Sequence, residues 1–224
     1  MTPEDPAMAL RNYLSFLRNC GFLCLVPRGA PRNPSPENYI PVLESEREKV
    51  CNCRLCPLAR NRTNAVYGEG NPQASLMFIG EAPGADEDLQ GRPFVGKAGK
   101  LLDSMMQKAG VDRKLVYITN GNKCRPPGNR DPEPEEVAAC RPYLIKQIET
   151  IRPKVIVALG RFAAHSLAGH TTPITKMRGN FFEYCGVRVM PTIHPSALFH
   201  NPTNMPLVIA DIATAAKEAG MIPA

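Results

Sequence analysis

The sequence lacks the features that would assign it to several special classes of protein. It contains no tryptophan, and we find no internal repeat, which excludes a repeat architecture. The longest early apolar run, Phe22 to Val26, is far too short for a signal segment or a membrane span. We therefore expect a cytoplasmic protein that does not associate with a membrane.

Cysteine is also scarce for a protein held together by disulfides. Eight cysteines in 224 residues are too few for a disulfide scaffold, and in a reducing compartment clustered cysteines favour metal ligation. The candidates are Cys53 and Cys56, spaced as Cys-x-x-Cys, followed by Cys124 and Cys140. Structural zinc normally takes two close pairs, and only the first pair is close here. The spacing therefore favours an iron–sulfur cubane, with zinc as the alternative.

The overall composition is that of a globular protein with a basic surface. Hydrophobic residues make up 43% of the chain and charged residues 21%. The formal net charge of +6 favours a polyanionic partner, although many basic proteins bind no nucleic acid. A chain of 224 residues can bury a sizeable core as one domain.

The beginning of the chain differs in composition from the remainder. Residues 8–19 carry apolar side chains at helical spacing, and the following segment, residues 27–36, is rich in proline. We expect an N-terminal helix and a proline-rich linker over residues 1–45, and a second domain over residues 46–224.

Within the second part, short apolar runs alternate with amphipathic segments. Strands are expected at Ser75–Ile79, Leu115–Thr119, Lys154–Leu159 and Val187–Ile193. Helices are expected at Ala98–Ala109, Glu135–Ile151, Phe162–Ala168 and Met205–Ala219. Strands that are apolar throughout and alternate with helices indicate an α/β fold whose mostly parallel, four-stranded sheet is covered on both faces.

In such sheets, ligands bind beyond the carboxyl ends of the strands. The loops at those ends are Gly80–Gly99, Asn120–Pro134, Gly160–Phe162 and His194–Pro202. Three of the four are rich in polar residues and in residues with special backbone geometry. This agreement predicts a functional site along that edge.

Three side chains in these loops are candidates for binding a planar ligand. Phe94 lies among glycines and prolines, where it can stack on a ring or fill a hydrophobic gap. Asn120 offers donors and an acceptor that suit an amide-like heterocycle, or it can cap a turn. His194 ends the last strand beside a proline, a position that favours a function over a structural role.

Four motifs, in order along the chain, carry a family resemblance. They are Gly80-Glu-Ala-Pro-Gly-x-x-Glu-Asp, Gly91-x-Pro-Phe-Val-Gly-x-Ala-Gly, Thr119-Asn-x-x-Lys-Cys-Arg-Pro-Pro and His194-Pro-Ser-Ala-Leu. Together with the cysteine pattern, they resemble the family 4 (iron–sulfur) uracil-DNA glycosylases, over about residues 50–219. The resemblance implies a three-layer αβα sandwich, a 4Fe-4S cluster and hydrolysis of the N-glycosidic bond of uracil in DNA during base excision repair.

The resemblance also implies roles for individual residues. Cys53, Cys56, Cys124 and Cys140 would hold the cluster. Phe94 would stack on the extruded uracil beside Gly80 and Ala82, Asn120 would read its Watson–Crick edge, and His194 would face O2. Glu87 would crowd the C5 position and so disfavour thymine. Ser196 and Leu198 would contact DNA, with Leu198 filling the gap left in the duplex.

The carboxylate that places water is open, because this chain has Ala82 where better-known uracil glycosylases carry aspartate. Glu81 is the first choice, Asp88 the second, and a water held by the Ala82 backbone is the third. Partners would be uracil-containing DNA, double- or single-stranded, and we expect a monomer in the cytoplasm, associated with the nucleoid.

Two other functions are consistent with parts of the pattern. A relative that traps uracil covalently would carry a histidine in the loop after the second strand, and residues 124–131 contain none. A zinc-bearing DNA-binding module without catalysis would be colourless, whereas an iron–sulfur protein is brown.

Overall fold

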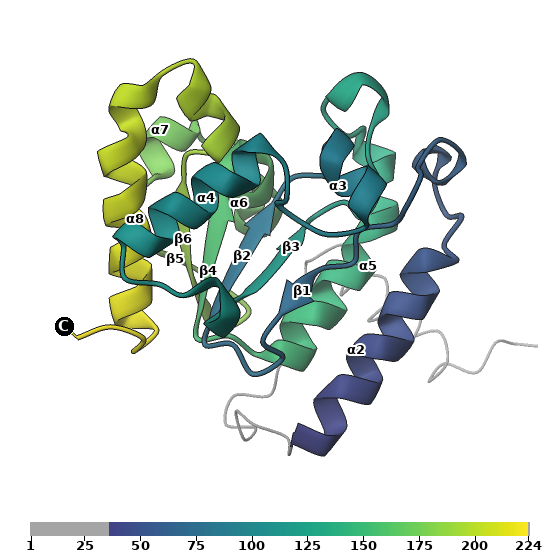
Figure 1. Ribbon diagram of the computed structural model, residues 1–224, viewed down its shortest axis with the longest axis horizontal. Helices are drawn as coiled ribbons and strands as arrows, with labels where there is room; N and C mark the ends of the chain where they lie inside the picture. Colours follow the sequence, from purple (N-terminus) through teal and green to yellow (C-terminus); the bar gives the residue numbers. More distant parts are fainter. Residues whose placement is uncertain (1–35, 224) are drawn as a thin grey trace, which may run out of the picture.

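The computed structural model describes residues 36–223, and its architecture is a sheet between two layers of helices (Figure 1). The strands are β1 (Glu69–Gly70), β2 (Leu76–Gly80), β3 (Tyr117–Asn120), β4 (Val155–Leu159), β5 (Phe182–Tyr184) and β6 (Val187–Thr192). The helices are α2 (Pro36–Cys51), α3 (Ala85–Gln90), α4 (Lys97–Lys108), α5 (Pro134–Ile151), α6 (Gly160–Ala168), α7 (Ile174–Met177) and α8 (Met205–Glu218). The helix expected at residues 8–19 and most of the proline-rich linker lie outside the described residues.

The six strands lie in the order β1-β3-β2-β4-β6-β5. The four central strands, β3, β2, β4 and β6, are parallel to one another, and the two outer strands are antiparallel to the strands beside them. The mostly parallel sheet is therefore confirmed, with its four expected strands at its centre. The expected number of four strands was too low, because β1 and β5 span only two and three residues and show no periodicity.

Two hydrophobic cores lie on opposite faces of the sheet. On one face, Phe78 and Val157 pack with Leu102 of α4 and Ile212 of α8. On the other face, the core joins the sheet to α2, α5 and α6 through residues such as Leu43, Ile148, Ile156 and Ala164. Strands β2 and β4 are buried along their full length because both of their faces are covered.

The helices begin and end where local chemistry satisfies their termini. Helix α5 starts with Pro134, and the Glu136 carboxylate accepts the Glu133 backbone N–H at 2.8 Å, as in a capping box. It ends at Arg152, which adopts a left-handed conformation. These ends hold the loop before α5 at the carboxyl edge of the sheet.

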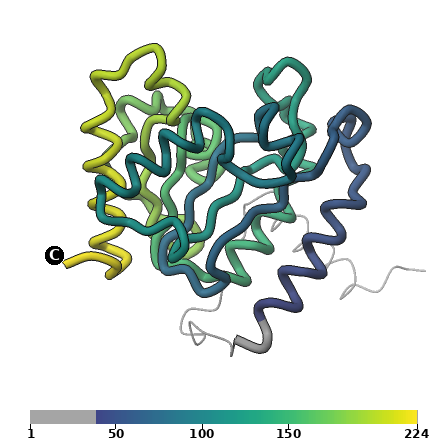
Figure 2. Tube along the Cα trace, viewed as in Figure 1, coloured from purple at the N-terminus to yellow at the C-terminus, as the bar shows by residue number. Residues whose placement is uncertain are grey.

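Helix α2 packs against α5, and Figure 2 shows the two running side by side. Its range, Pro36–Cys51, includes residue 45, where the boundary between the two parts of the chain was expected. Within residues 36–223, no helix is both long enough and apolar enough to cross a membrane.

Candidate active site

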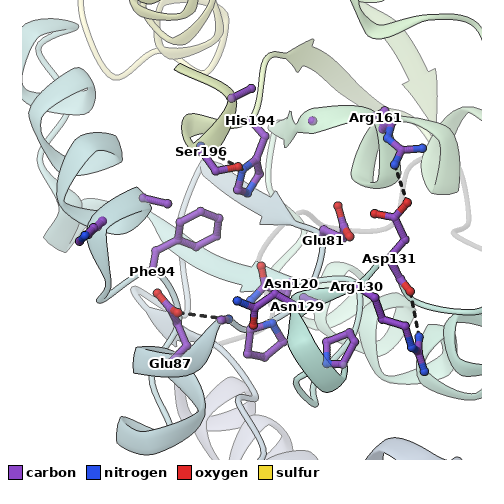
Figure 3. A pocket seen from close by; sticks show the side chains of 18 of the residues that line it. Glu81, Glu87, Phe94, Asn120, Asn129, Arg130, Asp131, Arg161, His194 and Ser196 are labelled. Atoms are coloured by element: carbon purple, nitrogen blue, oxygen red, sulfur yellow. Dashed lines mark hydrogen bonds and ion pairs between the residues drawn. The ribbon is translucent and has the colours of Figure 1, made fainter. Parts of the chain in front are cut away.

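A pocket of about 580 Å³ opens at the carboxyl edge of the parallel strands (Figure 3). It is lined by residues from all four loops that the sequence placed there, among them Glu81, Phe94, Asn120, Gly160 and His194. The strands end side by side because they are parallel and in register, with Gly80 of β2 paired to Asn120 of β3. The predicted location of the site agrees with this pocket.

Phe94 forms an aromatic wall of this pocket, and two glycines allow its position. A Cβ on Gly80 would come within 2.3 Å of Asn120 Oδ1 and 2.6 Å of Phe94 Cζ. A Cβ on Gly99 would meet the Phe94 carbonyl oxygen at 1.9 Å. Phe94 itself has a positive φ of 52°, which a non-glycine residue rarely adopts. The loop is therefore built around the placement of this ring.

Asn120 contributes an unused acceptor to the pocket. The residue is 2% exposed, and its Oδ1 atom is buried without a hydrogen-bond partner. A buried polar atom without a partner costs free energy, so such an atom in a pocket marks a place where a ligand completes the bond. The ligand must offer a donor at this point.

His194 presents a neutral imidazole to the same pocket. Burial lowers its pKa to about 4, so the ring carries no charge at neutral pH. The Ser196 backbone N–H donates to His194 Nδ1 at 3.2 Å, and Ser196 Oγ lies 2.7 Å from the same nitrogen. Because Nδ1 accepts, the proton is on Nε2, which leaves Nε2–H as the donor for a ligand. The Phe94 and His194 ring centroids are 5.9 Å apart.

Glu81 supplies a carboxyl group whose charge is disfavoured by its surroundings. Burial, together with the nearby negative charge of Asp131, raises its pKa to about 7, and the Arg161 guanidinium acts in the opposite direction. Asp131 and Arg161 form an exposed ion pair at 2.6 Å, and both line the pocket. A carboxyl group with a pKa near 7 can act as an acid or a base at neutral pH.

Asp88 does not line the pocket, and its expected role as the second choice for placing water stays a prediction. Its carboxylate accepts the Thr63 backbone N–H at 3.0 and 3.1 Å. This interaction joins α3 to a segment 25 residues earlier in the chain, and Asp88 is buried there. Its charge is used to hold the fold together.

Glu87 lines the pocket, but its carboxylate already has partners. It accepts backbone N–H groups from Gly84 at 3.1 Å, Val95 at 2.9 Å and Gly96 at 2.9 Å. The side chain thus clamps the loop that carries Phe94 onto α3. Its steric effect on the C5 position of a pyrimidine stays a prediction.

The turn after β6 buries Leu198, whose expected role in filling the gap in the duplex stays a prediction. Leu198 is 2% exposed and packs in the core with α4 and α8, so it cannot enter a duplex without leaving that core. The next residue, Phe199, is 55% exposed and lines the pocket. Leu198 and Phe199 are adjacent in the 3-10 helix Pro195–Phe199, and the rotation of this helix directs the first side chain into the core and leaves the second exposed. Ser196 is exposed, and contact with DNA stays a prediction for it.

The four predicted metal ligands come together at a second, smaller cavity. Cys53, Cys56, Cys124 and Cys140 all line it. The Arg62 guanidinium donates to Cys124 Sγ at 3.0 Å, and the Lys123 backbone N–H donates to Cys140 Sγ at 3.2 Å. Such donors to sulfur are typical of thiolates that hold an iron–sulfur cluster. Cys51, the neighbour of the first pair, is exposed.

Among the pocket residues that were not sequence candidates, Asp131, Arg161 and Phe199 bear most directly on the chemistry of the site. Asp131 and Arg161 lie in loops that the sequence assigned to the edge of the site, so the loop positions contained the signal. Charged side chains are common on protein surfaces, so these residue types alone do not indicate a functional site.

The pocket of this α/β protein combines an aromatic wall, an unpaired amide oxygen, a neutral imidazole donor and a carboxyl group with a raised pKa. These features suit a planar polar ring as the ligand. A model of the uracil DNA glycosylase superfamily matches residues 67–215. The chain belongs to this superfamily.

Several curated relatives are similar over most of the chain. A type-4 uracil-DNA glycosylase of Thermotoga maritima is 49% identical over 178 residues, which are 78% of this chain and 93% of the relative. The type-4 enzyme of Archaeoglobus fulgidus is 49% identical over 162 residues, 69% of this chain and 81% of the relative. A type-5 uracil-DNA glycosylase of Pyrobaculum aerophilum is 32% identical over 210 residues, 78% of this chain and 92% of the relative.

Proposed function

We propose that this protein is a type-4 uracil-DNA glycosylase, which hydrolyses the N-glycosidic bond of uracil in DNA and carries a 4Fe-4S cluster. The observation that carries the proposal is the unpaired Oδ1 of Asn120, buried in the pocket beside the Phe94 ring. Uracil offers an N3–H donor between two carbonyl oxygens, so it can complete this bond. Similarity to type-4 enzymes over most of the chain supports the same activity.

Binding begins with removal of the nucleotide from the duplex, because the bond cannot be reached inside the base stack. The extruded uracil stacks on Phe94, its N3–H donates to Asn120 Oδ1, and the Asn120 amide N–H donates to O4. Cytosine has no N3–H and would place an acceptor against Oδ1. Its C4 amino group would also place a donor against the amide N–H, so Asn120 distinguishes the two bases by the direction of two hydrogen bonds.

Bond cleavage then transfers an electron pair to the base. As the bond between C1′ and N1 breaks, negative charge builds on uracil N1 and O2, and positive charge builds on the sugar. Nε2–H of His194 donates to O2 and stabilises the first charge, and DNA phosphates together with the Glu81 carboxylate stabilise the second. Water held by Glu81 attacks C1′ and gives its proton to the carboxylate, leaving an abasic site and the uracil anion. The Glu81 carboxyl group then returns this proton through solvent to the uracil anion, which leaves as free uracil.

The cluster would be held by Cys53, Cys56, Cys124 and Cys140. It would connect the segment after α2 to the loop after β3 and to α5. In the described part of the chain, no three of the His, Cys, Asp and Glu side chains lie close enough to hold a single metal ion. The preference for the cluster over zinc rests on the spacing of the cysteines along the sequence and on the similarity to type-4 enzymes.

The test is incubation with an oligonucleotide that carries one uracil, followed by alkali, which cleaves the strand at an abasic site. The expected result is cleavage of the uracil strand and no cleavage of a matched thymine strand. Intact uracil strands would contradict the proposal, and a protein–DNA adduct that resists denaturation would indicate covalent trapping instead.

We further propose that the protein acts as a monomer in the cytoplasm, associated with the nucleoid. The basic net charge of +6 supports DNA as the partner. Scattering measurements of mass and fluorescence imaging of a tagged chain test these two statements.

A further inference from the structure

Lys123 is an almost fully buried lysine between the pocket and the cysteine cavity. Its side chain is 1% exposed, and its ammonium has three close acceptors. These are Thr119 Oγ1 at 2.7 Å, the Asn120 carbonyl oxygen at 2.6 Å and Gln147 Oε1 at 2.6 Å. An ammonium has three N–H donors, so this arrangement uses all of them.

The backbone of the same residue belongs to the cysteine cavity. Its N–H donates to Cys140 Sγ at 3.2 Å, and the following residue is Cys124. Lys123 therefore contacts the predicted cluster ligands with its main chain and the end of β3 with its side chain. Replacing the side chain separates the two functions, because the backbone donor remains.

The acceptors around the ammonium are themselves fixed. Thr119 Oγ1 donates to the Tyr67 carbonyl oxygen at 2.8 Å, and Gln147 Nε2 donates to the same oxygen at 2.8 Å. Asn120 is the member of this network that also lines the pocket. Burying an ammonium costs free energy unless it is fully paired, so a rigid shell of acceptors makes the cation tolerable.

We propose that Lys123 is a positioning residue for base recognition and cleavage. Its ammonium holds the Asn120 peptide, so that the unpaired Oδ1 stays directed into the pocket. This inference rests on the proposed uracil-DNA glycosylase activity.

The experiment compares the wild-type protein with Lys123→Met and Lys123→Gln. Methionine keeps the length and apolar stem of lysine but has no donor, and glutamine keeps a neutral donor. Lys146→Met is the matched control, because Lys146 is a half-buried lysine on α5 outside the network. Each protein is measured for iron and sulfide content, thermal midpoint, affinity for a duplex with an abasic site, and single-turnover excision of uracil.

The expected result is an excision rate that is about ten- to a hundredfold lower in Lys123→Met, which corresponds to loss of a hydrogen bond to a charged group. Iron content and affinity for the abasic duplex should remain at wild-type values, and Lys123→Gln should recover part of the rate. A role confined to folding would lower all of these quantities together.

Excision of uracil by Lys123→Met at the wild-type rate would overturn the inference and leave the proposed function intact. Loss of the cluster in both Lys123 variants would also overturn it, since the ammonium would then support the cluster and not Asn120. A wild-type protein that carries its cluster and does not excise uracil would overturn the proposed function itself.

Discussion

The Ser196 backbone N–H donates to Nδ1 of His194 at 3.2 Å, and this bond determines which ring nitrogen faces the pocket as a donor. Ser196 is only two residues further along the chain, in the 3-10 helix that begins at Pro195. The turn therefore orients the imidazole at the same time as it ends the strand. Because burial lowers the pKa of His194 to about 4, this donor is available throughout the neutral range.

Replacement of His194 by alanine should slow excision more than it weakens binding. The removed donor acts mainly on charge that develops in the transition state. Loss of one such donor costs about a hundred- to a thousandfold in rate. Single-turnover excision on a U·G duplex measures the rate, and affinity for an abasic duplex serves as the control. A fall of less than about tenfold, or an equal fall in affinity, would assign the charge stabilisation to another group.

The pH dependence should report the ionisation of Glu81. Its pKa is raised to about 7, and its carboxylate is the form that places water, so the excision rate should rise as pH rises through 7. His194 stays neutral over this range. Asp131→Asn removes the negative charge that raises the Glu81 pKa, so the profile should move to lower pH.

Arg161→Gln removes the positive charge that lowers the Glu81 pKa, so the same profile should move to higher pH. The two variants form a matched pair because they disrupt the same ion pair from opposite sides. Single-turnover rates across the pH range provide the measurement. A flat wild-type profile, or shifts in the same direction, would remove Glu81 from the water-placing role.

Phe199 and Leu198 should respond differently to truncation. Phe199 is exposed at the pocket, so Phe199→Ala should lower excision from a U·A duplex by about ten- to a hundredfold, the value of one stacked base, and change excision from single strands little. Leu198→Ala should instead lower the free energy of unfolding by about 2–5 kcal/mol, because it leaves a cavity in the core. Denaturant unfolding and excision of both substrates distinguish them. The opposite pattern would restore Leu198 as the residue that enters the duplex.

Replacing any one of the four predicted cluster ligands by alanine should bleach the visible absorption of the purified protein and lower its thermal midpoint. These ligands are Cys53, Cys56, Cys124 and Cys140. Loss of one thiolate leaves the cluster under-ligated, and the segments that it joins lose their connection. Cys51→Ala is the matched control, because Cys51 is adjacent but exposed, and its colour should remain. A colourless, stable wild-type protein with stoichiometric zinc after anaerobic purification would refute the cluster.

The sequence predicted the features that depend on local pattern. The central strands are buried on both faces, so their continuous apolar runs identified them, and parallel pairing then placed Asn120 and His194 at one edge. Features that depend on distant partners could not be obtained in this way. Asp88 accepts from Thr63, far from its own motif, and nothing in the motif indicates that partner.

Short elements were missed for a related reason. Strand β1 has two residues, and its antiparallel pairing with β3 is visible only once the sheet has formed. The burial of Leu198 and the exposure of Phe199 depend on the rotation of one 3-10 turn, which two adjacent apolar residues do not specify.

The central claim is that the Asn120 side chain reads the Watson–Crick edge of uracil, with Oδ1 accepting from N3–H and the amide N–H donating to O4, and Asn120→Asp tests it most directly on a U·G duplex. The substitution keeps the size of the side chain and replaces the amide donor to O4 with an acceptor. Single-turnover release of uracil should be rapid for the wild-type protein and about ten- to a hundredfold slower for the variant, as expected for one base-reading contact. Equal rates for the two proteins would contradict the account, because the base would then be read elsewhere.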